Sequence, residues 1–209
     1  MNRLNRAAIV AGTVGPLAFG LTVAGLSVAQ YDFMRGLGWN PITAPTFDWP
    51  SGLALGPYGL LMTLAFVVGG AGLALLALGV GQSLRAGSVG RVAAAMLVLA
   101  GIAMAALASP TDPTLTTRVA TITGRIHDLS FVALGLTLFP AILLFAVAFR
   151  RDPAWRPLSI WTWLTLALAA PAFILKGPAF YVFLAAVLVW VEAVAARLGR
   201  VDSTNVPGA

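Results

Sequence analysis

The sequence predicts an all-α membrane protein built as a bundle of six transmembrane helices. Three observations lead to this class: 59% of the 209 residues are apolar, only 10% are charged, and the mean hydropathy is +0.92. A soluble domain needs far more charge than this to cover its surface. The apolar part of the chain is large enough for six spans of about 20 residues each.

The apolar stretches give the spans in order, separated by segments that hold nearly all the Asp and Arg residues. Each stretch is close to the length that crosses the hydrocarbon core of a bilayer. We expect a single domain over residues 1–200 and a flexible polar tail over residues 201–209. The predicted spans are residues 7–29, 58–80, 92–108, 127–149, 158–175 and 179–198.

The first span also has features of a secretory signal peptide. Arg3 and Arg6 precede its apolar run, and the run ends in the small residues Ser27, Val28 and Ala29. The run is longer than the apolar core of a usual signal peptide, so we expect it to remain as a membrane span.

The second span is rich in glycine, which predicts close packing against other helices. Ala65 with Gly69, and Gly70 with Ala74, are pairs of small residues four positions apart. Such pairs let two helix backbones approach closely inside a membrane. A phosphate-binding loop would need a Lys-Ser or Lys-Thr ending and a preceding strand, and the segment has neither.

The distribution of Lys and Arg predicts that both termini lie in the cytoplasm. Cytoplasmic segments of membrane proteins hold the excess of these residues. The net charge of +6 therefore reflects membrane topology, and we expect no binding of nucleic acid. One side has nine basic residues, Arg3, Arg6, Arg85, Arg91, Arg150, Arg151, Arg156, Arg197 and Arg200, and the other has four, Arg35, Arg118, Arg125 and Lys176.

The strongest sign of a functional site is a group of polar residues on the side away from the cytoplasm. Four of the seven acids and the only histidine fall there. Ionisable groups at the membrane are costly and tend to be functional. We expect Asp32, Asp112, His127 and Asp128 to form an extracytoplasmic pocket that binds a ligand.

Each of these residues also has a structural interpretation. Asp112 precedes a proline and is typical of a turn or a helix cap, and Asp128 is placed to pair with Arg125. His127 and Asp128 are consecutive, so on a helix they point about 100° apart. A catalytic pair therefore requires His127 to reach Asp112 or Asp32 on another element.

Residues 114–126 have apolar side chains spaced by four, three and four positions, with Thr and Arg between them. This spacing predicts an amphipathic helix, which either lies in the membrane interface or extends the fourth span. As a lid it would cover the polar group, although an anchor for the loop is the favoured interpretation.

Several chemistries conflict with the composition. A chain without cysteine has no thiol nucleophile, disulfide, iron–sulfur cluster or zinc ribbon. One histidine is too few for a membrane zinc hydrolase or for bis-histidine haem ligation. The sequence thus predicts no metal site and identifies no cofactor.

A hydrolase remains the main alternative. His127 would act as the base, with Asp112 to orient it and Ser109 or Ser130 as the nucleophile, although no nucleophile elbow is present. This interpretation requires a hydroxyl or carboxylate from outside the helix turn of His127 within about 6 Å of the ring.

Two segments carry a resemblance to a bacterial family. Pro110-Thr111-Asp112-Pro113 and the segment from Gly124 to Phe131, which contains His127 and Asp128, are its most specific parts. With the Gly-rich second span, they make the chain similar to domain-of-unknown-function family 998. The resemblance implies six helices in a bacterial cytoplasmic membrane and implies no activity. The long Pro-rich first connection departs from the family pattern.

The sequence therefore favours a membrane protein that binds a small ligand, a lipid headgroup or a membrane-protein partner over an enzyme. The hydrolase that uses His127 and Asp112 is one alternative. A structural subunit of a larger membrane complex is the other.

Overall fold

The computed structural model describes residues 3–85 and 87–204, and within these residues six helices are long and apolar enough to cross a membrane. Their outer faces are apolar: Leu21, Leu60 and Leu136 expose 72%, 71% and 68% of their surface, as side chains in contact with lipid would. The predicted six-helix class is confirmed. The helices are α1 (Arg3–Ala29), α3 (Gly59–Ser83), α4 (Gly87–Ala106), α5 (Ile122–Arg151), α6 (Ser159–Leu175) and α7 (Ala179–Thr204).

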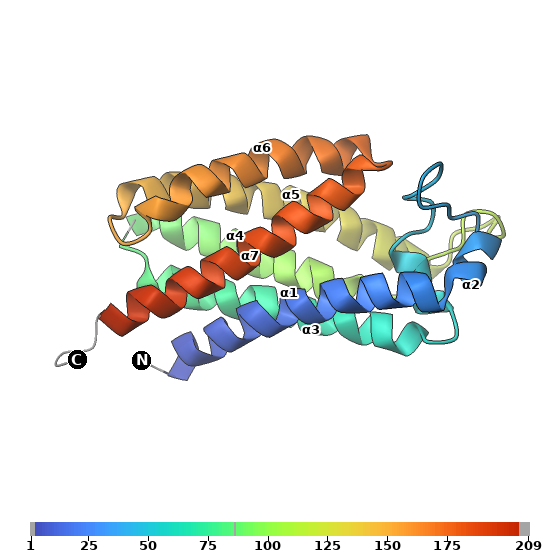
Figure 1. Cartoon of the computed structure of the whole chain (residues 1–209), viewed down its shortest axis with the longest axis horizontal. Coiled ribbons are helices and arrows are strands. Elements are labelled where there is room, and N and C mark those ends of the chain that lie inside the picture. Colours follow the sequence, from blue (N-terminus) through green and yellow to red (C-terminus); the bar gives the residue numbers. More distant parts are fainter. Residues whose placement is uncertain (1–2, 86, 205–209) are drawn as a thin grey trace.

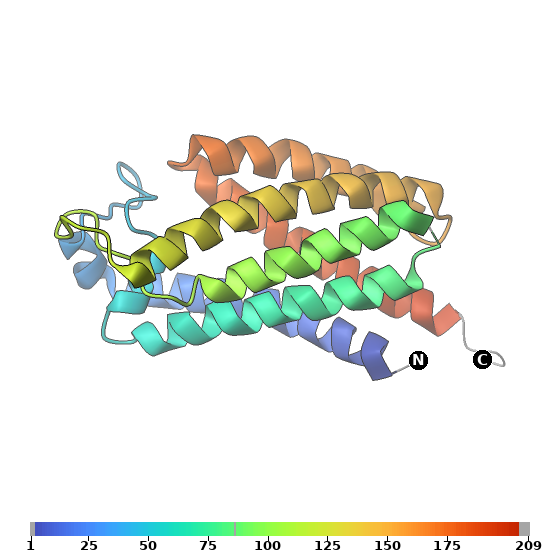
Figure 2. The same cartoon turned by 180° about the vertical axis from the view of Figure 1, so that it is seen from behind.

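The helices form one bundle, with both described ends of the chain at the same end of it (Figure 1). The long connection between α1 and α3 lies at the opposite end and holds α2 (Tyr31–Gly36) and the short 3-10 helix η1 (Ser51–Leu55). Figure 2 shows the α4–α5 connection at that same end. A second 3-10 helix, η2 (Arg156–Leu158), precedes α6 at the end with the termini. We call the end with α2 and η1 the loop end.

Glycines bring α1, α3 and α4 into close contact, as the small-residue pairs predict. A Cβ atom on Gly101 of α4 would lie 2.5 Å from the carbonyl oxygen of Gly70 in α3. On the other face of α3, a Cβ on Gly72 would lie 2.6 Å from the carbonyl oxygen of Ala11 in α1. Neither position has room for a side chain, so the backbones themselves form the contact.

Aromatic side chains fill the other half of the bundle, between α5, α6 and α7. At the end with the termini, Phe149 stacks on Trp155 with ring centroids 4.9 Å apart. Nearer the loop end, Phe173 contacts both Phe131 and Phe183. These contacts join α5 to α6 and α6 to α7, and Phe139 of α5 also contacts Phe183 of α7.

Two sequence predictions are corrected. Residues 114–120 are not helical, because α5 begins only at Ile122. The two prolines that flank Asp112 and the hydrogen bonds that Asp112 makes hold this segment as a loop. At the other end of the chain, α7 continues past Arg200 to Thr204 and buries Val201. The first residues of the predicted tail are therefore helical, and residues 205–209 lie outside the described residues.

Candidate functional site

The start of α5 is fixed by Asp112 of the preceding loop. Thr121 is the N-cap of α5, and its hydroxyl accepts a hydrogen bond of 3.0 Å from the backbone N–H of Gly124. Asp112 in turn accepts from both the backbone N–H and the hydroxyl of Thr121, at 2.7 and 2.8 Å. A Cβ on Gly124 would collide with the carboxylate of Asp112. This close fit sets the position of the first turns of α5, which carry His127.

His127 links three parts of the loop end. Its Nδ1 lies 3.0 Å from the carbonyl oxygen of Leu107 and 2.9 Å from that of Ser109, both just after α4. Its Nε2 lies 2.8 Å from the hydroxyl oxygen of Ser51 in η1. Carbonyl oxygens only accept hydrogen bonds, so the ring proton belongs on Nδ1, and this assignment follows from the hydrogen-bond network. Nε2 is then an acceptor, and the Ser51 hydroxyl donates to it.

Ser51 is held in place by the connection on which it lies. Gln30, at the end of α1, donates to the carbonyl oxygen of Leu53 at 3.0 Å and accepts from the backbone N–H of Tyr58 at 3.1 Å. Asp48 accepts from the backbone N–H and the hydroxyl of Thr114, at 2.9 and 2.6 Å. These bonds fix η1 between α1 and the α4–α5 loop, and thereby hold Ser51 against His127.

A cavity of about 640 Å³ extends from this pair into the bundle. On α5 it is lined from His127 to Leu138, and on α7 from Phe180 to Val191. Each interval spans twelve residues, or eleven steps along the helix, which is roughly 16 Å at the rise of an α-helix. This depth is about half the ~30 Å thickness of a bilayer's hydrocarbon core.

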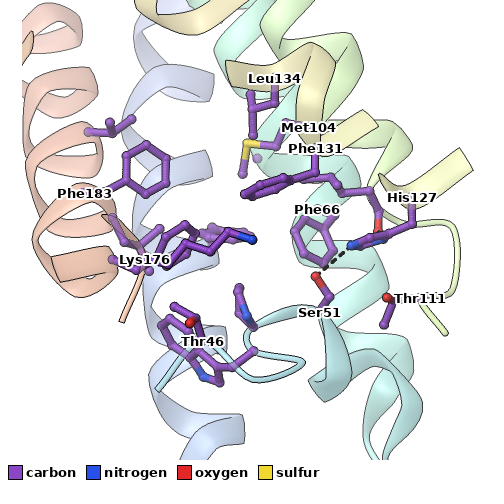
Figure 3. Close-up of a pocket in the computed structure, with 18 of the residues that line it drawn as sticks. Thr46, Ser51, Phe66, Met104, Thr111, His127, Phe131, Leu134, Lys176 and Phe183 are labelled. Carbon is purple, nitrogen blue, oxygen red and sulfur yellow. Dashed lines mark hydrogen bonds between the residues drawn. The ribbon is translucent and has the colours of Figure 1, made fainter. Parts of the chain in front are cut away.

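The wall of the cavity changes from polar to apolar with depth. The loop end is lined by Ser51, His127, Asp128 and Lys176 and by threonines of the two long connections, among apolar residues that include Phe47, Trp49 and Pro50. Figure 3 shows the Lys176 side chain extending across the cavity toward Ser51 and His127. Its ammonium lies 5.8 Å from the centroid of the Phe131 ring. The inner part is lined by Phe19, Phe66, Leu73, Met104, Leu134, Leu138, Phe183, Leu184, Val187, Leu188 and Val191.

The protein-family model described as "Protein of unknown function (DUF998)" matches residues 22–198. The chain belongs to the DUF998 family. The matched region begins in the last third of α1, covers all of α3 to α6 and most of α7, and contains both segments on which the resemblance rests. Comparison with curated proteins and with solved structures found no match.

In this DUF998 protein, two of the four predicted ligand-binding residues line the cavity. His127 is buried beside Ser51, and Asp128 is exposed at the rim. Asp112 does not line the cavity, because both of its carboxylate oxygens bind Thr121. Asp32 lies exposed in the first turn of α2 and is not part of the wall either.

The proposed pairing of His127 with Asp112 is wrong, since both ring nitrogens of His127 have other partners. The requirement for a hydroxyl within about 6 Å of the ring is met by Ser51, which the sequence did not single out. Ser109 and Ser130 donate their hydroxyls to backbone carbonyl oxygens, of Thr123 and Ile126. Neither serine contacts the ring through its side chain.

Sequence reasoning also missed Lys176 as part of the site. Lys176 lies just after α6. From the sequence it is one of four basic residues in the segments predicted to lie away from the cytoplasm, and nothing else in its position points to a site. One feature of the sequence points to it: it is the only lysine in a chain with twelve arginines. Among the described residues, no three His, Cys, Asp or Glu side chains come together in a way that could hold a metal ion.

Proposed function

We propose that this protein binds an amphipathic lipid, with the hydrocarbon chain in the cavity and the polar group at Ser51, His127 and Lys176. The observation that carries the proposal is the gradient along the cavity wall: charged and hydroxyl groups lie at the loop end, among aromatic residues, whereas the inner wall is made of Phe, Leu, Met and Val. Small-molecule sites are typically concave and apolar, with a few polar groups that orient the ligand.

The shape of the cavity supports a ligand with a long chain. A depth of roughly 16 Å and a volume of about 640 Å³ exceed what a small polar metabolite fills. The apolar inner wall offers such a metabolite no hydrogen-bond partners, whereas each buried CH₂ of a hydrocarbon chain contributes about 0.8 kcal/mol. A lipid therefore fits both the wall and the length.

We also propose that the site opens on the extracytoplasmic side of a bacterial cytoplasmic membrane. The loop end holds four basic residues against nine at the end with the termini, which supports cytoplasmic termini. A lipid of the outer leaflet could then enter with its polar group toward the loop end.

Native mass spectrometry of the protein in mild detergent tests the lipid proposal. The variant Leu134→Trp places an indole in the cavity, where Leu134 is 8% exposed and part of the wall. The control Leu136→Trp lies on the same helix and is 68% exposed to the outside. We expect a bound lipid mass in the native protein and in the control, and its loss in Leu134→Trp.

The proposal fails if the native protein carries no lipid even after incubation with a bacterial lipid extract. It also fails if a lipid mass persists unchanged in Leu134→Trp. Thermal unfolding of both variants checks that each is folded, because an oversized core side chain can cost ~1–3 kcal/mol.

A further inference from the structure

The contact between Ser51 and His127 has the geometry of a nucleophile and its general base. The hydroxyl oxygen of Ser51 is 2.8 Å from Nε2, within the range in which a positioned base removes a proton. Because the Nδ1 proton faces two carbonyl oxygens, Nε2 presents its lone pair to the hydroxyl. The ring is thus in the tautomer that a general base requires.

The two carbonyl oxygens take the position that a carboxylate has in a serine–histidine–aspartate triad, and they orient the ring by the same hydrogen bond at Nδ1. A third group orients the imidazole and stabilises the positive charge that forms when Nε2 takes the proton. Here the carbonyl oxygens of Leu107 and Ser109 hold Nδ1 at 3.0 and 2.9 Å. The ring is also 5% exposed and lies edge-on to Phe66, so it has little freedom to rotate.

The pair faces the proposed lipid site. Ser51 and His127 both line the cavity at its polar end, where the polar group of an amphiphile would lie. Lys176 extends toward them from the opposite wall (Figure 3). A positive charge there suits a reaction in which negative charge develops on a carbonyl oxygen.

We infer that this protein hydrolyses a carboxylic ester of a lipid, with Ser51 as nucleophile and His127 as general base. The Ser51 oxygen bonds to the ester carbonyl carbon as its proton passes to Nε2. The bond from that carbon to the alcohol oxygen then breaks, and the departing alcohol takes the proton from Nε2. Water, activated in the same way by His127, releases the fatty acid and restores Ser51. The inference rests on the proposed function, because the cavity must hold the acyl chain.

A fluorophosphonate with a long alkyl chain tests the nucleophile directly, because it bonds to activated serines and releases fluoride. We expect the purified protein to gain one alkyl-phosphonyl group, located on Ser51 by peptide mapping, and Ser51→Ala to gain none. His127→Gln should slow the labelling by about 10²- to 10⁴-fold, the usual contribution of a general base.

The control variant is Ser130→Ala on the same helix as His127. The Ser130 hydroxyl donates to the carbonyl oxygen of Ile126 and does not line the cavity, so its removal should leave the labelling rate unchanged. A purely structural role for the Ser51–His127 bond predicts a different result. Both Ser51→Ala and His127→Gln would then lower the unfolding temperature, and Ser51 would stay unlabelled in the folded native protein.

A second measurement covers the case in which His127→Gln does not fold. The native protein should hydrolyse a long-chain p-nitrophenyl ester at least 100-fold faster than Ser51→Ala, and native mass spectra of the unaltered protein report lipid binding separately. A lipid adduct without labelling or hydrolysis overturns the catalytic inference and leaves lipid binding intact. Absence of any lipid adduct overturns the proposed function itself.

Discussion

At the scale of single residues, two aspartates act on two threonines by the same chemistry. Asp48 and Asp112 each accept both the backbone N–H and the hydroxyl of one threonine, Thr114 and Thr121. A carboxylate bound in this way orders a loop, because it satisfies two donors of the same residue at once. The two aspartates thus fix the loops at this end of the bundle. These loops in turn hold His127 and Ser51 next to each other.

Asp112→Ala is predicted to destabilise the fold. The substitution leaves the N–H and the hydroxyl of Thr121 without their acceptor and removes a negative charge near the N-terminus of α5. We expect a loss of ~1–3 kcal/mol in unfolding free energy, seen as a lower midpoint of thermal unfolding in detergent. The matched control, Asp32→Ala, alters an exposed acid on α2 and should shift the midpoint little. Equal shifts for the two variants would contradict the role of Asp112 in holding Thr121 at the start of α5.

The residues of the site differ in how visible they are in the sequence. His127 is the only histidine and starts a predicted span, so it can be found without a structure. Ser51 cannot, because it is 76 residues away in the chain and resembles any other loop serine. Asp112 and Asp32 were predicted to join the pocket because ionisable groups near a membrane tend to be functional. In the structure Asp112 binds Thr121 instead, and Asp32 is exposed on α2.

At the scale of helices, the apolar composition of the chain was enough to locate every span, because a segment that crosses the hydrocarbon of a bilayer must be a helix with an apolar outer surface. The small-residue pairs of α3 likewise predicted close packing, and Gly70 and Gly72 make it, on opposite faces. The spacing of apolar residues predicts an amphipathic helix over residues 114–126, of which residues 114–120 are a loop in the structure. The spacing does not reveal that Asp48 binds Thr114 at the start of this loop and that Asp112 binds Thr121 just after it, and these hydrogen bonds hold the segment as a loop.

Gly101→Ala is predicted to weaken the contact between α3 and α4. Its new methyl group would lie 2.5 Å from the carbonyl oxygen of Gly70, so the two backbones would have to separate. We expect a cost of about 3 kcal/mol, at the upper end for overpacking, measured as a lower unfolding midpoint. The control is Gly25→Ala, where a Cβ meets nothing within 4 Å. Alanine is the better helix former, so Gly25→Ala should be neutral or slightly stabilising, and a large loss there would undermine the comparison.

At the scale of the whole molecule, the two ends of the bundle differ in kind. The end with the termini has short connections, most of the arginines and an aromatic core in which Phe149 stacks on Trp155. The loop end has long connections tied together by side-chain hydrogen bonds, and the cavity is lined by these connections. The cavity with Ser51 and His127 lies toward the loop end, so the orientation of the chain decides from which side of the membrane a ligand would reach it.

That orientation is testable because the chain has no cysteine and single cysteines can be added without background. Thr116→Cys lies exposed in the α4–α5 loop at the loop end, and Ser88→Cys lies exposed at the start of α4, at the end with the termini. With nine basic residues on the side of Ser88 and four on that of Thr116, the positive-inside rule predicts the outcome. A maleimide that cannot cross membranes should label Thr116→Cys in spheroplasts and label Ser88→Cys only after the membrane is permeabilised. The reverse pattern would turn the cavity and its Ser51–His127 pair toward the cytoplasm, where the lipid would have to come from the inner leaflet.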